Sequence, residues 1–309
     1  KLGKRVLTTG GHFGYLKIAE GCDKHCTYCI IPKLRGKFRS VPMERLIEQA
    51  KEMAEEGVKE LILVAQETTV YGTDIYGKKS LHVLLKELCK IKGIRWIRVL
   101  YCYPEEIYDE LIQTMKEEKK ICHYLDLPIQ HASDRILKRM GRRTTQAELV
   151  EIVNKLRQEI PDIVLRTTLI SGFPGETQED HEELMGFVDE MEFDRLGVFT
   201  YSAEEDTPAA TMPDQVPEEV KEERRDEIME LQQEISYDKG TDRIGQELLV
   251  MIEGKVADES AYIGRTYGDA PKVDGYIFVQ TGELLMTGDF AKVRVTGALE
   301  YDLIGELAD

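Results

Sequence analysis

The chain has 309 residues, of which 42% are hydrophobic and 32% are charged, and its formal net charge is −17. This length is enough for one large domain with a smaller second domain, and the apolar fraction is that of an ordinary globular core. So acidic a chain is not expected to be a general nucleic-acid binder, and no run reaches the about 18 apolar residues of a membrane span.

Strand-like and helix-like segments alternate over the first two thirds of the chain. Runs rich in apolar residues predict six strands, at 15–20, 61–65, 95–101, 124–127, 164–170 and 195–201. Helical spacing of apolar residues predicts the segments between most of them, at 43–56, 81–91, 105–117, a stretch broken near Gly141 that ends at residue 160, and 178–191. The pattern indicates six strand–helix repeats.

Six repeats are too few for a closed eight-stranded barrel, and they fit an α/β fold in which a parallel sheet curls into a six-unit partial barrel. A doubly wound open sheet is the alternative from the pattern alone. In both folds ligands bind at the carboxyl ends of the strands, so functional residues are expected in the loops that follow the strands. The loop after the fifth strand ends with Thr177 and Asp180, an N-cap signature for the next helix.

A second, smaller domain is predicted after residue 239. Residues 204–227 carry ten acidic and three basic residues, so the first half is expected to be a linker-like loop, and residues 218–238 a charged helix outside the barrel. Short β runs follow at 247–253, 262–267, 275–279, 290–299 and 301–305. These runs predict a small antiparallel β-barrel, and they divide the chain into residues 1–239 and 240–309.

Cys22, Cys26 and Cys29 are the strongest sign of function in the sequence. Three thiolates at this spacing can converge on one metal centre, whereas a four-iron four-sulfur cluster usually takes four cysteines, so one iron is left open to a substrate or cofactor. A zinc site is the alternative, with His25 or a distant histidine such as His123 as its fourth ligand.

The other cysteines stand singly in apolar or aromatic stretches, and they are predicted to be buried thiols rather than a disulfide framework: Cys89, Cys102 and Cys122. Reduced cysteines favour the cytoplasm as the compartment.

Basic residues are unevenly placed. Residues 1–50 hold ten Lys/Arg against four Asp/Glu, and a run just after the cysteines is either a solvated loop or a patch that holds an anion: Lys33, Arg35, Lys37 and Arg39. Arg166 shares one strand face with Thr168 and Ile170. If that face points into the barrel, the guanidinium needs an anionic partner, which is either a ligand carboxylate or a structural Asp or Glu.

The run from Cys22 to Cys29, with Tyr28 before the last cysteine, resembles the cysteine motif of radical S-adenosylmethionine (SAM) enzymes. The resemblance implies one [4Fe-4S] cluster whose open iron chelates SAM, on a six-unit partial barrel. Residues 63–72, 127–131, 172–177 and 201–205 resemble the methylthiotransferase family within that superfamily, and residues 240–309 resemble a TRAM domain.

The same resemblance implies which residues bind SAM. Gln66 and Glu67 follow the second strand, where the superfamily carries a Gly-Gly-Glu-like motif that contacts the methionyl amino group. Gln130 follows the fourth strand, toward the adenosine. Gly172 and Gly175 let the backbone come close to a ligand. For Arg166, the SAM carboxylate is one candidate partner and a substrate carboxylate is another.

Residues 36–40 and 264–275 resemble the branch of the family that adds a methylthio group to the β-carbon of an aspartate in the twelfth small-subunit ribosomal protein. The sister branch modifies an adenosine in transfer RNA. Residues 240–309 hold six Lys/Arg and thirteen Asp/Glu, a surface that repels phosphate and suits a basic ribosomal protein. We therefore expect a protein substrate, no direct nucleic-acid binding and no membrane.

The family reaction starts from an external reductant such as flavodoxin or ferredoxin, and the radical derived from SAM removes hydrogen from the unreactive β-carbon. In this family an N-terminal domain holds the sulfur at a second cluster, and its cysteine motif is not found in this sequence. We expect this chain to bind one cluster and SAM and to be incomplete for methylthiolation. The alternative from another class is a non-catalytic scaffold ordered by zinc or by a degenerate cluster.

Overall fold

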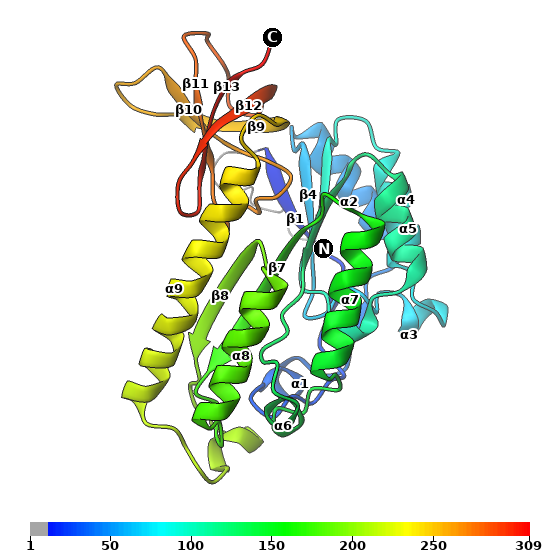
Figure 1. Ribbon diagram of the computed structural model, residues 1–309. Helices are drawn as coiled ribbons and strands as arrows, with labels where there is room; N and C mark the ends of the chain where they lie inside the picture. Colours follow the sequence, from blue (N-terminus) through cyan, green and yellow to red (C-terminus); the bar gives the residue numbers. More distant parts are fainter. Residues whose placement is uncertain (1–11) are drawn as a thin grey trace.

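The computed structural model describes residues 12–309 and shows a helix-covered parallel sheet with a small β-barrel above one of its ends (Figure 1). The first eleven residues of the predicted large domain lie outside the described residues. Within the described part, no helix is both long enough and apolar enough to cross a membrane.

The sheet has six parallel strands in the order β1-β4-β5-β6-β7-β8. Their bounds are Phe13–Lys17 for β1, Glu60–Val64 for β4, Trp96–Val99 for β5, Ile121–Asp126 for β6, Val164–Ser171 for β7 and Arg195–Thr200 for β8. Because the strands are added in chain order, each right-handed connection places its helix on the same face. A doubly wound sheet reverses its order in the middle, so the partial barrel is confirmed and the open-sheet alternative is wrong.

Five main helices follow strands of this sheet: α2 (Met43–Glu55), α4 (Leu81–Cys89), α5 (Asp109–Glu117), α7 (Gln146–Glu159) and α8 (Gln178–Met191). Shorter elements lie in the loops after the strands: β2 (Ala19–Glu20), α1 (Ile31–Arg35), β3 (Arg39–Ser40), α3 (Thr73–Tyr76), η1 (Pro104–Glu106), α6 (Asp134–Arg139) and η2 (Pro208–Thr211). The predicted helix over 105–117 is in fact split, because Ile107 and Tyr108 have extended backbones between η1 and α5.

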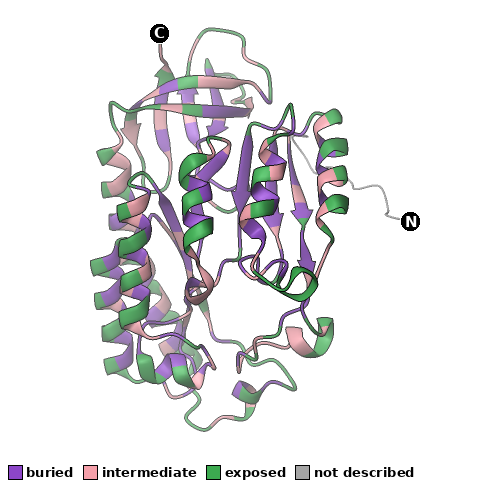
Figure 2. Cartoon of the chain, turned by 90° about the vertical axis from the view of Figure 1, so that its right-hand side faces the viewer, coloured by how far each residue is buried: buried purple, intermediate pink, exposed green. Residues whose placement is uncertain are grey.

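Both faces of the sheet are apolar, which explains the continuous hydrophobic runs of its strands. In β4, Leu61 and Leu63 pack against the helices, whereas Ile62 points to the inner face with Phe13 and Trp96. Figure 2 shows the buried residues along the strands and on the sides of the helices that face the sheet. The outer apolar face is covered by helices, so the inner face needs another cover.

The small barrel supplies part of that cover. It is closed, with the order β10-β11-β13-β12-β9 and the bounds Glu247–Lys255 for β9, Ala261–Arg265 for β10, Ile277–Gln280 for β11, Phe290–Ala298 for β12 and Leu303–Leu307 for β13. The predicted small barrel is confirmed, but β11 and β13 pair in parallel. A ring of five strands cannot alternate direction all the way round, so one neighbouring pair must be parallel.

Helix α9 (Glu218–Asp242) runs along the side of the molecule from the lower end of the large domain to the barrel (Figure 1). Its buried side packs against β8 and α8, and Gln232 Nε2 donates to the Phe193 carbonyl at 2.8 Å. The predicted limit between residues 239 and 240 falls inside this helix, which continues four residues beyond the predicted end at residue 238.

A buried group of charges joins the barrel to the amino ends of the strands. The carboxylate of Glu60 lies between the guanidinium groups of Arg98 and Arg265, and all three side chains are 0% exposed. The distance from Arg98 Nε to Glu60 Oε2 is 2.8 Å. Burial alone would raise the pKa of Glu60, but Arg265 and Arg98 hold it below its ordinary value. The carboxylate is therefore charged and paired.

We predict that Glu60→Gln lowers the free energy of unfolding by about 3–5 kcal/mol, because it leaves the buried guanidinium of Arg98 without a carboxylate partner and leaves Arg265 only Glu253. The only tryptophan, Trp96, packs edge-on against Phe290 of the barrel at 5.0 Å, so its fluorescence during urea unfolding reports on this interface. As a matched control, Glu87→Gln in the exposed pair with Lys90 should cost less than about 1 kcal/mol. Equal effects of the two changes would contradict the prediction.

Candidate functional site

The cysteine loop begins directly after β2, at the end of the sheet opposite the small barrel, beside α1 (Figure 1). Its first residue, Gly21, has a φ of +79°, and a Cβ there would lie 2.3 Å from the Lys37 carbonyl oxygen. The amide of Cys22 donates to the Gly36 carbonyl at 3.2 Å. Position 21 requires glycine, because the backbone conformation is unfavourable for other residues and the approach leaves no room for a side chain.

The far side of the loop is bound to segments that follow β6 and β8. The Thr27 amide donates to the Met140 carbonyl and its hydroxyl donates to the Arg139 carbonyl, both at 2.8 Å. The Thr27 carbonyl accepts from the Ala209 amide at 2.8 Å. Hydrogen bonds on both sides therefore fix the loop before any metal binds.

The three thiols are near enough to influence one another electrostatically. Cys22 and Cys26 are buried and Cys29 is half-buried. Burial raises the pKa of Cys22 to about 11, and the nearby groups that also raise it are Glu67, Cys26 and Cys29. Thiols in such a setting are neutral until a cation balances them, and metal coordination deprotonates them. The set therefore fits a positively charged iron–sulfur centre.

The two histidines considered as a fourth zinc ligand have other surroundings. His123 hydrogen-bonds instead with Asp162 at 2.6 Å and with the Met115 carbonyl at 3.1 Å, and His25 is exposed.

Glu67 and Gln130, two of the residues predicted to bind SAM, carry buried oxygen atoms without a hydrogen-bond partner among the described residues. Glu67 follows β4 and is 3% exposed; its Oε1 lacks a partner, and Lys24 Nζ lies 3.9 Å away. Burial raises the pKa of Glu67 to about 8. The Oε1 atom of Gln130 is likewise unpartnered, and this residue has a φ of +72°. Buried polar atoms are nearly always bonded, so these two oxygens fit a ligand that carries donors, such as SAM. Gln66 is exposed beside them.

Gly172 and Gly175, also predicted to lie close to the cofactor, come close to protein side chains. Both have positive φ, but a Cβ at Gly172 would meet the Lys221 side chain, and one at Gly175 would lie 2.7 Å from Arg139 Nε. Their amides are also occupied, by Glu176 Oε1 at 3.1 Å and by the Asp214 carbonyl at 2.8 Å. Protein side chains therefore fill the space that these glycines open, and their cofactor contacts stay a prediction. The predicted cap of α8 by Thr177 and Asp180 is present.

Arg166 lies near the amino end of β7, far from the cysteine loop along the strand. Its Nε is 3.6 Å from Asp126 Oδ1, and its Nη1 is 3.4 Å from Asp274 Oδ1 of the small barrel. The guanidinium is therefore paired with two protein carboxylates. One belongs to β6 of the large domain and the other to the second domain. These pairs correspond to the alternative of a structural Asp or Glu partner, and SAM binding by Arg166 stays a prediction.

Sequence reasoning missed a charged cluster beside the cysteine loop. Lys24 Nζ lies 3.2 Å from Glu106 and 3.5 Å from Glu105. The ring of Tyr103 lies between two cations, with Lys24 Nζ at 4.8 Å and Arg142 Cζ at 4.3 Å from its centroid. Lys24 lies between Cys22 and Cys26 in the sequence, and Tyr103 follows the third predicted strand. Both positions could therefore have been recognised as part of the site. Their mutual contact was not visible in the sequence.

The remaining cysteines are free thiols, with Cys102 and Cys122 buried as predicted and Cys89 half-buried. The four basic side chains after the cysteine loop are exposed. Lys33 donates to the Asp206 carbonyl at 2.7 Å, and Arg35 lies 3.7 Å from Glu20. The run is therefore a solvated basic loop.

Comparison with known proteins agrees with this site. The family model of the Radical SAM superfamily matches residues 16–188, and that of the TRAM domain matches residues 244–308. A solved structure of a radical S-adenosylmethionine methyltransferase, TsrM from Kitasatospora setae, with cobalamin and a [4Fe-4S] cluster bound, superposes with a TM-score of 0.54 at 15% identity. The match covers 64% of this chain and 38% of the TsrM chain, and it shows that the two share a fold.

Curated relatives are far more similar in sequence. "Ribosomal protein uS12 methylthiotransferase RimO" of Lachnoclostridium phytofermentans is 66% identical over 97% of this chain and 68% of its own length. The proteins of the same name from Clostridium perfringens and Clostridioides difficile are 57% and 52% identical over 98% of this chain, and 67% and 68% of their own lengths align. The chain therefore belongs to the radical SAM superfamily and, within it, to the RimO family of ribosomal protein uS12 methylthiotransferases.

Proposed function

We propose that this chain holds the [4Fe-4S] cluster and SAM of a methylthiotransferase that modifies the β-carbon of an aspartate in ribosomal protein uS12. One observation carries the proposal. Three cysteines lie on a loop fixed from both sides, at the end of the sheet where Glu67 and Gln130 each carry a buried oxygen without a hydrogen-bond partner among the described residues. The names of the relatives, which are 52–66% identical, support the substrate.

Within this proposal, Cys22, Cys26 and Cys29 hold the cluster and leave one iron for SAM. Glu67 and Gln130 accept hydrogen bonds from SAM. When bound, the reduced cluster and SAM supply the radical chemistry that a side-chain base cannot, because a β-carbon proton is too weakly acidic for proton transfer at neutral pH. The chain's own part is to bind, orient and shield these groups, so we assign no further catalytic side chain.

Our proposal for this chain includes one cluster. The chain spans about two thirds of the length of the curated relatives that it matches. The cysteines outside the loop, Cys89, Cys102 and Cys122, lie on or beside sheet strands and helices and do not share one site. We therefore propose one cluster for this chain, reduced by a flavodoxin or ferredoxin in the cytoplasm.

We predict about four irons per chain after anaerobic reconstitution. Gly21→Ala should reduce bound iron to less than about half, because the added Cβ collides with the Lys37 carbonyl that shapes the loop. Gly57→Ala is the matched control: it has a φ of +99° but nothing within 4 Å of the added Cβ, so it should retain wild-type iron. Iron and sulfide analysis measures both. Eight irons per chain, or equal loss in the two variants, would sink this assignment.

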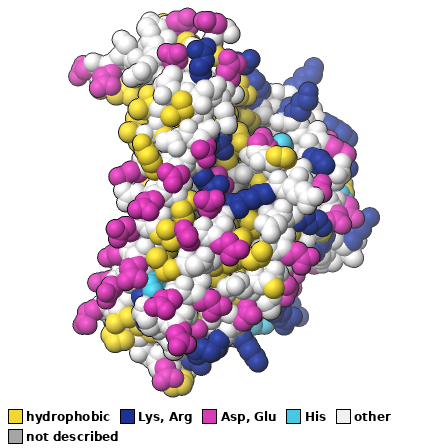
Figure 3. All heavy atoms as spheres, viewed as in Figure 1, with side chains coloured by type: hydrophobic (Ala, Val, Ile, Leu, Met, Phe, Trp, Pro, Cys, Tyr) yellow, Lys and Arg dark blue, Asp and Glu magenta, His cyan; other side chains and the backbone are white. Residues whose placement is uncertain are grey.

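The charge of the surface supports a basic protein as the substrate. Residues 240–309 contain six Lys/Arg and thirteen Asp/Glu. Figure 3 shows further acidic side chains gathered along the side of the molecule formed by α9. The exposed acidic residues of that helix are Glu218, Glu219, Glu222, Glu223, Asp226, Glu227, Glu230, Glu234, Asp238 and Asp242. Such a surface attracts a basic ribosomal protein and repels the phosphates of transfer RNA.

We predict that the chain binds purified uS12 at least about tenfold more tightly than transfer RNA near physiological salt. Fluorescence anisotropy with labelled uS12 and labelled transfer RNA measures both affinities. An unrelated basic protein of similar size is the control for charge alone, and it should bind more weakly than uS12. Tighter binding of transfer RNA would instead favour the sister branch of the family.

A further inference from the structure

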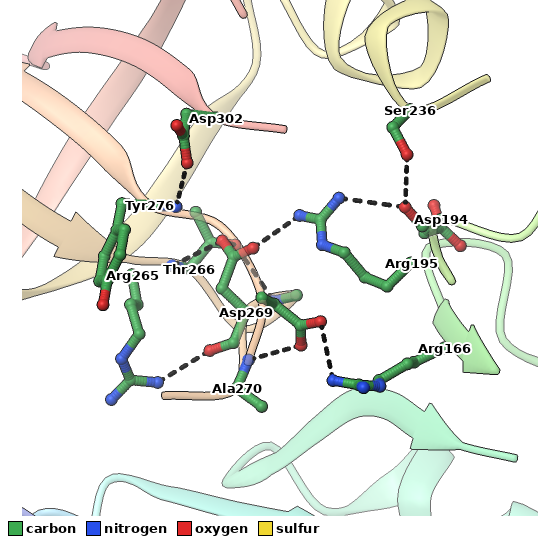
Figure 4. Close-up of polar contacts among 12 residues, drawn as sticks. Arg166, Asp194, Arg195, Ser236, Arg265, Thr266, Asp269, Ala270, Tyr276 and Asp302 are labelled. Atoms are coloured by element: carbon green, nitrogen blue, oxygen red, sulfur yellow. Dashed lines mark hydrogen bonds and ion pairs between the residues drawn. The ribbon is translucent and has the colours of Figure 1, made fainter. Parts of the chain in front are cut away.

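The small barrel reaches into the large domain through the loop between β10 and β11. Figure 4 shows Arg166 and Arg195 extending from the sheet toward this loop. Asp274, at its end, uses both carboxylate oxygens: Oδ2 accepts from the Tyr124 hydroxyl at 2.6 Å and from the Ala270 amide at 2.9 Å, and Oδ1 lies 3.4 Å from Arg166 Nη1. The position of Asp274 is therefore fixed by both domains.

Arg166 also contacts Asp126, at the end of β6. Its Nε lies 3.6 Å from Asp126 Oδ1, and Asp126 is 6% exposed. The pKa of Asp126 is raised, because burial and the charge of Asp274 raise it more than the hydrogen bond from the Tyr101 amide and the charge of Arg166 lower it. Arg166 lies between the two carboxylates and is the counter-charge that Asp126 and Asp274 share.

The second oxygen of Asp126 holds Tyr101, which follows β5. Asp126 Oδ2 accepts from the Tyr101 amide at 2.9 Å. Tyr101 has a φ of +59°, a conformation that a bulky residue adopts only when its surroundings enforce it. A charged acceptor on its amide is such an enforcing contact.

Tyr101 in turn holds the residue next to Glu67. The Tyr101 carbonyl accepts from the Thr68 amide at 2.9 Å and from the Thr68 hydroxyl at 3.1 Å. The hydroxyl also reaches the Leu100 carbonyl at 2.8 Å, and Thr68 is fully buried. The backbone that carries Glu67 is therefore tied to the left-handed residue at the end of β5.

We propose that Asp274 of the small barrel is a positioning residue for Glu67, acting through this continuous series of contacts. The inference rests on the proposed function, because it takes Glu67 as a SAM ligand. It gives the barrel a role besides substrate recognition. Docking of the barrel at the amino ends of the strands sets the geometry of a cofactor residue at their carboxyl ends.

The test compares three Asp→Asn variants of the same chain. Asp274→Asn and Asp126→Asn interrupt the series. Asp269→Asn is the matched control, because Asp269 lies on the same loop and pairs with Arg195 at 2.6 Å. Arg195 lies beside Arg166 in the sheet, but no side-chain hydrogen bond or ion pair joins Asp269 or Arg195 to Arg166, Asp126 or Tyr101 in the described structure. Hydrogen–deuterium exchange of the cluster-free protein reports on the amides of Thr68 and Tyr101, and equilibrium binding to the reconstituted protein reports on SAM.

We expect Asp274→Asn and Asp126→Asn to speed exchange at the Tyr101 and Thr68 amides by about tenfold, the effect of losing one charge-assisted hydrogen bond. SAM binding should weaken by a similar factor of about ten in both variants. Asp269→Asn should loosen residues 266–270 and leave those two amides and the SAM affinity within about twofold of wild type.

Equal effects of Asp274→Asn and Asp269→Asn on exchange and SAM affinity would mean that only general docking of the two domains matters, and this would overturn the proposal. Unchanged amide exchange in Asp274→Asn would overturn it as well. If Asp274→Asn does not fold, Asp126→Asn decides by the same criteria. A wild-type chain that binds no SAM would refute the proposed function, while the exchange data would still decide whether the barrel positions the Glu67 backbone.

Discussion

Glu60 is a buried carboxylate between two buried guanidinium groups, one from β5 and one from the small barrel. This arrangement attaches the small barrel to the sheet, and the sheet needs that cover because of the direction of its connections. Connections that all advance in one direction leave the inner face without helices. At its amino end that face is closed by barrel residues such as Met251 and Phe290, and charges buried there are tolerated only in pairs.

Closing one end of the partial barrel with protein leaves the other end for chemistry. At the amino end, the carboxylates of Glu60, Asp269 and Asp274 are all paired with arginines. At the carboxyl end, oxygens of Glu67 and Gln130 are buried without hydrogen-bond partners in the described structure. The three amino-end carboxylates are thus used within the protein, whereas Glu67 and Gln130 each keep an oxygen available to accept a hydrogen bond from a ligand.

Glycines at positions that looked alike in the sequence have different roles in the structure. Two glycines at positive φ, Gly21 and Gly172, both permit a close approach, but the approaching atoms differ. At Gly21 they belong to the backbone that shapes the cysteine loop, and at Gly172 to the side chain of Lys221 on α9. A glycine in a motif shows that something comes close, and only the fold shows whether that is a ligand or the protein itself.

The sequence by itself determined the features that depend on neighbours along the chain. These include the cysteine spacing, the alternation of strands and helices, the bounds of α8, and the cap formed by Thr177 and Asp180. Hydrophobic periodicity and capping are local, so they could be recognised without a structure. The winding of the sheet, by contrast, came from the family resemblance and was then decided by the strand order.

Only the tertiary structure decided what each charged residue pairs with. Arg166 was correctly placed among residues that need an anion, but its partner Asp274 is 108 residues away in another domain. Tyr103 lies beside Lys24 only because the loops after β1 and β5 meet at the same end of the sheet. Periodicity gives the face on which a side chain lies, whereas its partner depends on packing between distant segments, and that information is not present in any local stretch of sequence.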